Sequence, residues 1–226
     1  ALGLIVWWLP AGDLWSTIRS VPAGAWPAAI GVYLLCHLMG VVKWRMLTNA
    51  AGAALGFRTA SHAYYWGLFG NTFMPSIVGG DVVRAGVALR QAGSRSGLLL
   101  GSLVDRVQDV VGLGALAGIG ALLSPRALDA ASRRIFLGFV VLMALLALGG
   151  MATLWFFPAR RLPFRYRRKL VQVLRAIRAT AAKPHALAAA FGLGLLLQAA
   201  LVVLNWQLGR LMGIDIPLYV WLFVWP

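Results

Sequence analysis

The chain alternates between long apolar runs and short polar breaks, a pattern typical of helices that cross a bilayer. A spanning helix needs about 20 mostly apolar residues. The runs that fit this length cover about residues 26–47, 96–123, 135–157 and 185–212. The pattern therefore predicts an all-α fold: a polytopic helical membrane protein with a single transmembrane domain over residues 1–226.

Both ends of the chain lie in apolar runs, at 1–9 and at 217–226, and each predicts a partial span. A shorter segment at 14–22 is expected to lie along the membrane interface. The sequence shows neither the basic lead nor the small-residue cleavage site of a signal peptide. We therefore expect a piece of a longer membrane domain, truncated at both ends.

One apolar stretch, residues 59–92, is interrupted by helix breakers. Residues 59–80 contain no Asp, Lys or Arg. The second half of this segment, however, holds Asn71, Pro75, Gly79 and Gly80. Proline removes a backbone donor and glycine permits a sharp turn. Non-helical backbone at membrane depth is tolerated only where protein or water satisfies its polar groups.

We therefore predict a broken helix pair over 59–92, either re-entrant or making two passes. Asp81 follows the glycine pair directly and suits the N-cap of a short amphipathic helix over 82–92. Broken helices of this kind often build binding sites in transporters.

Composition supports a membrane protein. The chain is 61% hydrophobic and only 12% charged, whereas soluble domains are about 45–50% apolar and roughly 25% charged. This excludes a soluble catalytic domain within the 226 residues. Cys36 is the only cysteine, so no internal disulfide can form.

The charge is strongly basic, with 21 Lys and Arg against 6 acids, all of them Asp. Such charge can indicate nucleic acid, but in membrane proteins it collects in cytoplasmic loops, so no nucleic-acid partner is expected. Residues 158–184 hold nine basic residues and no acid, which predicts a cytoplasmic loop and places 124–134 outside. Anionic lipid headgroups are the natural partner of this charge. The span after Trp26 is expected to close at Lys43 and Arg45.

Three charges lie inside the predicted span 96–123: Asp105, Arg106 and Asp109. Each is costly in hydrocarbon, at least ~2.5–3.5 kcal/mol at a helix centre, so they should face protein or a wet cavity. Asp105 and Asp109 share a helix face, and Arg106 and Asp109 have a spacing that permits pairing. Asp81 and Arg84 have the same three-residue spacing.

Two interpretations of these charges remain open. In one, Arg84 and Arg106 hold a phosphate, aided by the exposed amides of a helix N-terminus. In the other, Asp81 only caps a helix and the arginines only neutralise aspartates. The lone His37 and His62 lack partners at ligand spacing, and no serine has a nearby histidine. Neither a metal nor a cofactor is therefore expected.

Two motifs resemble those of the lysylphosphatidylglycerol synthase transmembrane, or flippase-like, family. They are "NTFMPSIVGGDVVRA" at 71–85 and "VDRVQDVVGLGAL" at 104–116, with "KWRML" upstream. The matched positions are Asn71, Pro75, Gly79, Gly80, Asp81, Arg84, Asp105 and Arg106. At Asp109 a small residue would be expected, and a second glycine-rich turn usual later in the family is absent.

The resemblance implies a multi-pass protein of a prokaryotic plasma membrane that moves a phospholipid or lipid-linked molecule between leaflets, without a catalytic residue in this chain. Two other functions remain open: the membrane part of a lipid aminoacyl transferase or another lipid-modifying enzyme, and a scaffold subunit that only assembles partners. The partners expected are membrane lipids and, among proteins, a second copy of the chain or a lipid-modifying enzyme.

Overall fold

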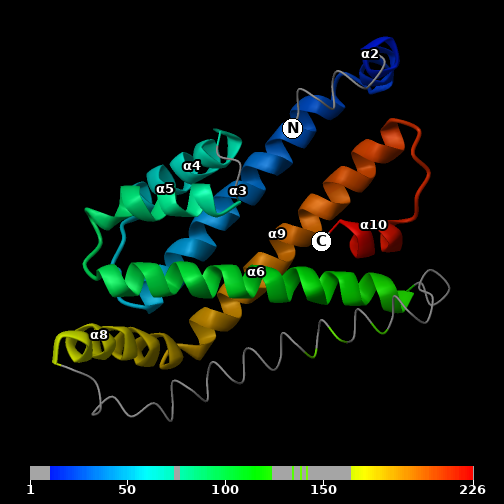
Figure 1. The fold of residues 1–226 in the computed structure, drawn as a ribbon. Coiled ribbons are helices and arrows are strands. Elements are labelled where there is room, and N and C mark those ends of the chain that lie inside the picture. The colour runs from blue at the N-terminus through cyan, green and yellow to red at the C-terminus, as the bar shows by residue number, and fades with distance from the viewer. Residues whose placement is uncertain are drawn as a thin grey trace.

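The computed structural model describes residues 11–73, 77–123 and 164–225, with the isolated positions 134, 138 and 141, and those residues contain no strand. The helices are α2 (Ala11–Ser20), α3 (Ala25–Ala50), α4 (Phe57–Phe73), α5 (Ile77–Leu89), α6 (Arg95–Leu123), α8 (Phe164–Ala181), α9 (Pro184–Leu211) and α10 (Leu218–Val224) (Figure 1). The predicted all-α fold is therefore confirmed. The spans expected at 1–9 and 135–157 and the loop at 124–134 lie outside the described residues, apart from the isolated positions.

Three of the helices, α3, α6 and α9, are long and apolar enough to cross a membrane. They match the spans predicted at 26–47, 96–123 and 185–212. Their outer faces are apolar: on α3, Ile30, Leu34 and Leu35 are each more than half exposed. Soluble monomers rarely expose such contiguous apolar surface, so these faces suit contact with lipid.

The prediction that Lys43 and Arg45 close the first full span was wrong. Helix α3 continues to Ala50, and Lys43 lies within it with only 3% of its surface exposed. A buried ammonium group is tolerated there because carboxylates of α6 neutralise it, as described below. The position of a basic residue at the end of an apolar run did not mark the helix end.

The chain reverses sharply after α3. The Asn49 side chain donates to the Leu55 carbonyl at 3.0 Å and accepts from the Leu55 N–H at 2.6 Å. Gly52 has a φ of +95°, a backbone conformation that residues with side chains rarely adopt and that therefore favours glycine. This locked turn fixes where α4 begins.

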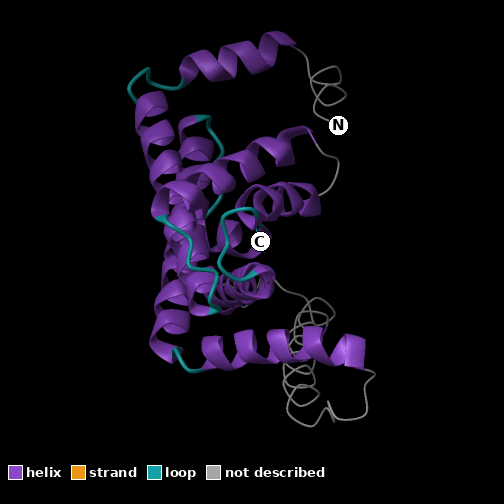
Figure 2. Ribbon diagram, turned by 90° about the vertical axis from the view of Figure 1, so that its left-hand side faces the viewer, coloured by secondary structure: helices purple, strands orange, loops and turns teal. Residues whose placement is uncertain are grey.

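The three long helices form a crossed frame. Helices α3 and α9 run antiparallel, since the start of α3 and the end of α9 line one pocket together. Helix α6 lies across both (Figure 1), and it approaches α3 closely because Gly101 has no side chain: a Cβ there would lie 2.7 Å from the Thr48 nitrogen. Helices α2 and α8 run across opposite ends of this frame (Figure 2).

Residues 57–89 form a helical hairpin of α4 and α5, which pack against each other. The two-helix interpretation of 59–92 therefore holds, with Pro75 outside the described residues. The two ends of the hairpin lie together: the Gly93 N–H donates to the Ala53 carbonyl at 2.9 Å, and the Thr59 hydroxyl donates to Gln91 Oε1 at 2.6 Å. The chain thus enters and leaves the hairpin beside the C-terminal end of α3.

The predicted helix 82–92 with Asp81 as its N-cap was wrong. Helix α5 begins at Ile77, so Gly79, Gly80 and Asp81 lie inside it. The glycines serve close packing rather than a turn: a Cβ on Gly80 would overlap the Asn71 side chain and the Gly67 carbonyl. Asp81 is therefore free to use its carboxylate for ion pairs.

Candidate functional site

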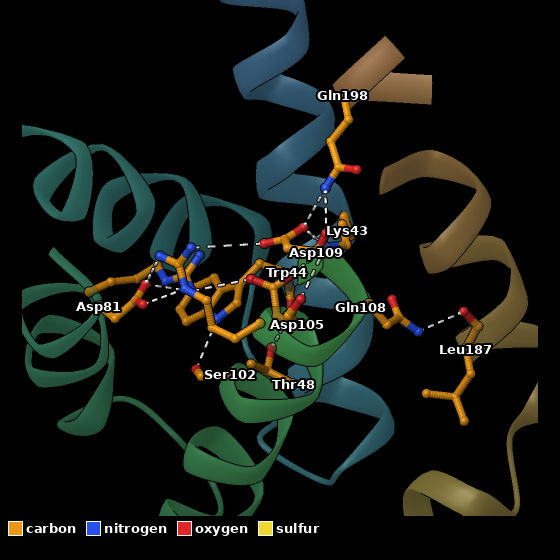
Figure 3. Close-up of polar contacts among 12 residues, drawn as sticks. Lys43, Trp44, Thr48, Asp81, Ser102, Asp105, Gln108, Asp109, Leu187 and Gln198 are labelled. Carbon is orange, nitrogen blue, oxygen red and sulfur yellow. Dashed lines mark hydrogen bonds and ion pairs between the residues drawn. The ribbon is translucent and has the colours of Figure 1, made fainter. Parts of the chain in front are cut away.

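A polar cavity of about 180 Å³ lies where α3, the α4–α5 hairpin, α6 and α9 meet. Six of the residues that line it are ionisable groups of opposite sign: Lys43 on α3, Asp81 and Arg84 on α5, and Asp105, Arg106 and Asp109 on α6. We call these six residues the charge network. Figure 3 shows Asp105 and Asp109 between Asp81 on one side and Lys43 with Gln198 on the other.

The inner half of the network is nearly closed to solvent. The side chains of Lys43, Arg84 and Asp105 are 3%, 6% and 6% exposed. Asp105 receives both cations, with Lys43 Nζ 2.9 Å from Oδ1 and Arg84 Nη2 3.2 Å from Oδ2. Burying any one of these charges alone would cost several kcal/mol, so the three depend on one another.

The Arg84 guanidinium lies over two aromatic rings. Its guanidinium carbon lies 4.7 Å from the centre of the Trp44 ring and 5.6 Å from that of Tyr64. Trp44 is itself fixed, since its indole N–H donates to the Ser102 hydroxyl at 3.0 Å. Arg84 Nε is buried and has no hydrogen-bond partner among the described residues. The site therefore contains a fixed guanidinium with an unused donor.

The outer half of the network is more open. The side chains of Arg106, Asp109 and Asp81 are 40%, 30% and 22% exposed. Arg106 donates two hydrogen bonds to Asp81. One runs from Nε to Oδ2, and the other from Nη2 to Oδ1 at 2.6 Å. Its Nη1 lies 4.0 Å from Asp109 Oδ2. Arg106 is thus the cation most accessible from outside the cavity.

Helix α9 contacts the charge network through Gln198 and Gly194. Gln198 Nε2 donates to the Asp109 carbonyl at 3.1 Å and lies 3.5 Å from Asp109 Oδ1. Gly194 leaves room for the Lys43 side chain, because a Cβ at this position would lie 2.9 Å from Lys43 Cε. Lys43 is thereby directed at α6, with its Nζ 2.5 Å from Asp109 Oδ1.

Most of the predicted site residues meet here. Arg84, Arg106, Asp81 and Asp105 form ion pairs with one another, and Gly80 lines the same cavity. Asn71 lines it too and accepts from the Gly80 N–H at 2.9 Å. It therefore acts on the first turn of α5, where backbone N–H groups often lack partners within the helix. Gly79 lies in α5 but does not line the cavity, and Pro75 lies outside the described residues.

Sequence reasoning missed Lys43, Trp44, Tyr64 and Gln198. The signal for Lys43 was present: it interrupts an otherwise apolar helix, as Asp105 does. Because Lys43 stands near Arg45 in "KWRML", the pattern favours the end of a span at this position instead of a buried charge. Nothing in the local sequence marks Tyr64 or Gln198, because only the tertiary arrangement brings them to the cavity.

The charges of the network balance. Lys43, Arg84 and Arg106 supply three cations, and Asp81, Asp105 and Asp109 supply three carboxylates. With all six ionised, the site is therefore neutral as a whole. The site can be reached from outside the cavity at Arg106, whose side chain is partly exposed.

Helices long and apolar enough to cross a membrane, a packed hairpin and a charge network between them define a helical membrane protein with a polar site among its helices. The chain belongs to the family described as the lysylphosphatidylglycerol synthase TM region, whose model matches residues 1–226. The resemblance stated from the motifs is therefore confirmed. The comparisons with curated proteins and with solved structures found no match.

Proposed function

We propose that this protein moves a phospholipid or lipid-linked molecule between the leaflets of a prokaryotic plasma membrane, with residues 158–184 on the cytoplasmic side. The observation that carries the proposal is the charge network: six ionisable groups around one small cavity, among helices whose outer faces suit lipid. Ionisable groups at membrane depth are expensive and commonly mark substrate pathways.

The size and chemistry of the cavity suit a headgroup rather than a whole lipid. Its volume of about 180 Å³ is below the roughly 300–1,000 Å³ of pockets that enclose drug-sized ligands. A phosphate can reach Arg106, the most exposed cation, and then the unused Nε of Arg84. Arginine suits this role because its fixed donors match phosphate oxygens. The acyl chains would stay in the bilayer.

Exchange of ligands within the network makes passage of a charged group feasible. Asp81 already occupies two donors of Arg106, as a phosphate would. A phosphate that replaces this carboxylate keeps the guanidinium paired, so no cation is left bare in a medium of low dielectric. Asp81 and Asp105 hold the arginines in place between such events.

A second function, the membrane part of a lipid aminoacyl transferase, is favoured by the description of the matched family, which names a synthase. In that case the cavity would present the lipid to an enzyme domain or a partner enzyme. The two functions differ in one measurable respect: a transporter moves lipid between leaflets by itself, whereas a presenting domain does so only with its enzyme.

The proposal is tested by leaflet-resolved transport in reconstituted vesicles, using labelled phosphatidylglycerol. We compare the wild type with the double variant Asp81→Asn, Arg106→Gln, which removes one charge of each sign and keeps the network neutral. We expect the wild type to move the probe and the double variant to lose most of this transport while it keeps its thermal stability.

The matched control is Arg210→Gln with Asp215→Asn, the same chemical changes at exposed residues outside the cavity. This control should transport like the wild type. Normal transport by a stable Asp81→Asn, Arg106→Gln variant would mean that the network is only scaffolding. No transport by the wild type would reject the transporter function and leave the presenting domain.

A further inference from the structure

We propose that a net-anionic headgroup enters the cavity together with a proton, and that Asp109 takes up this proton. The inference rests on the proposed function, because it describes how the same cavity accepts its lipid. It goes further in assigning a coupled ion and the residue that carries it.

The first step is the charge balance. With three cations and three carboxylates around one cavity, the network has no positive charge to spare. A phosphodiester with no compensating amine adds one negative charge, which would remain unpaired among buried groups. An unpaired buried charge is strongly destabilising, by about 3–5 kcal/mol. Protonation of one carboxylate restores neutrality without any movement of the helices.

The second step identifies the carboxylate. Asp81 accepts two hydrogen bonds from Arg106, and its Oδ1 lies 3.0 Å from Arg84 Nη2. Asp105 is 6% exposed and pairs with both Lys43 and Arg84. Asp109 is different, because its second cation, Arg106, is 4.0 Å away and its side chain is 30% exposed. It is the carboxylate that can most readily exchange a proton with water.

Lys43 favours the ionised form of Asp109, because an adjacent cation stabilises a carboxylate, but Lys43 does not depend on Asp109 alone for its neutralisation. Its Nζ lies 2.5 Å from Asp109 Oδ1 but also 2.9 Å from Asp105 Oδ1. When Asp109 becomes neutral, Lys43 therefore keeps an ionised partner. A headgroup that binds Arg106 would weaken the second cation contact of Asp109, so binding of the anion itself favours uptake of the proton.

The surroundings of Asp109 are otherwise uncharged. Helix α9 contributes Gln198, which contacts Asp109, and Leu197, which lines the cavity, as does Tyr64 of helix α4; the remaining charged groups belong to the network on α3, α5 and α6. No residue of α8 or α10 is among the described residues that line the cavity. Gln198 Oε1 is buried and lacks a partner in the part of the chain that the structure describes. A protonated Asp109 would offer its O–H to this oxygen once the amide rotates.

The balance of the step is simple. A proton from bulk water bonds to a carboxylate oxygen of Asp109 as the anionic headgroup arrives, and it returns to water when the headgroup leaves. By linkage, the affinity for the anion must then fall by about tenfold per pH unit above the pKa of that carboxyl. A zwitterionic headgroup needs no proton, since it brings its own positive charge.

The test measures proton uptake directly. Purified protein in weakly buffered detergent receives short-chain phosphatidylglycerol or short-chain phosphatidylcholine, and a pH-sensitive dye and calorimetry follow protons and binding. We expect about one proton taken up per bound phosphatidylglycerol and none per bound phosphatidylcholine. Binding of phosphatidylglycerol without a proton at any pH would overturn the coupling alone, whereas binding of neither lipid would overturn the proposed function as well. Equal uptake with both lipids would exclude charge compensation.

Two further measurements assign the proton to Asp109. Asp109→Asn should bind phosphatidylglycerol with an affinity that no longer depends on pH and without proton uptake, while Asp215→Asn, an exposed control, should behave like the wild type. In the wild type, infrared difference spectroscopy should show a new protonated-carboxyl band on addition of phosphatidylglycerol, a readout that needs no variant. Proton uptake that persists in a folded Asp109→Asn protein, or the absence of the band, would reject this residue.

Discussion

Lys43 shows how a single buried charge depends on its partners. Its ammonium group is 3% exposed and contacts Asp105 and Asp109 together. We expect Lys43→Met to lower the free energy of unfolding by about 3–5 kcal/mol, because it removes the nearest cation of Asp105 and Asp109 and leaves the network with one uncompensated negative charge. Chemical denaturation in detergent measures the change.

A second substitution should restore most of the stability that Lys43→Met removes. Lys43→Met combined with Asp109→Asn leaves two cations and two carboxylates, so most of the lost stability should return. Lys183→Met serves as the control, because Lys183 is exposed between α8 and α9 and surface changes are usually within about ±0.5 kcal/mol. A Lys43→Met protein as stable as this control would show that the ion pairs contribute nothing.

Arg84 tests whether charge alone is enough at the centre of the site. Lysine keeps the charge but cannot bridge Asp81 and Asp105 while it stacks on Trp44. We expect Arg84→Lys to lower the free energy of unfolding by about 1–2 kcal/mol and to reduce lipid transport. Arg210→Lys is the matched control, since Arg210 also lies over a tryptophan, 5.3 Å from the Trp206 ring, but is exposed. Equal effects in the two variants would contradict a special role for Arg84.

The residues that sequence could identify share one property: they carry charge in the middle of an apolar run. Asp105 and Arg106 meet this condition plainly. Lys43 also carries charge within an apolar run. However, it stands near the apparent end of that run, two residues before Arg45, which is typical of the end of a span. Gln198 carries no charge, and its role follows only from the packing of α9 on α6. Neutral polar partners of a buried network are therefore the part that a sequence hides.

At the scale of elements, the α4–α5 hairpin depends on small residues at its contact. We expect Gly80→Ala to destabilise the protein by about 1–3 kcal/mol, because the added methyl would overpack the contact with Gly67 and Asn71. Gly86→Ala on the same helix is the control, since nothing lies within 4 Å of its added Cβ. That change should be neutral or stabilising by about 0.5–1 kcal/mol, through helix propensity.

Thermal denaturation of both variants, with hydrogen exchange of α4 and α5, measures this prediction. Faster exchange confined to the hairpin in Gly80→Ala would locate the damage there. If the two alanine variants were equally stable, the helices would not be in the close contact on which the site geometry depends.

The hairpin also shows where element-level prediction from sequence fails. Two helices instead of one span could be predicted, because polar and helix-breaking residues interrupt an apolar stretch. The start of the second helix could not, since a glycine pair is compatible both with a turn and with close packing of two helices. The partner surface decides between these, and here Gly67 and Asn71 on α4 provide it. Asp81 therefore lies inside helix α5 and in the charge network, not at the N-cap position that the sequence predicts.

At the scale of the whole molecule, the arrangement of helices implies two different ends. Helix α8, with the exposed Arg175 and Arg178, lies across the end of the frame where α3 stops and α9 starts. Helix α2 lies across the opposite end (Figure 2). The two ends of the α4–α5 hairpin lie beside the C-terminal end of α3, on the side of α8. Basic residues then gather at one end, as the positive-inside rule requires of a cytoplasmic face.

This geometry predicts that the α4–α5 hairpin returns the chain to the side of the membrane that it left, by a re-entrant path or by two passes, and labelling can test this. In a Cys36→Ser background, single cysteines replace Gln91 after the hairpin, Arg178 on α8 and Asp215 after α9, all of which are exposed. With an impermeant reagent on sealed vesicles of known orientation, we expect positions 91 and 178 to react from the cytoplasmic side and position 215 from the other. The reason is that a hairpin with adjoining ends returns the chain to the side it left, whereas α9 crosses once. Labelling of 91 and 215 from the same side, with 178 opposite, would mean that residues 57–89 cross the membrane only once, which would contradict the hairpin and remove the basis for a headgroup site beside it.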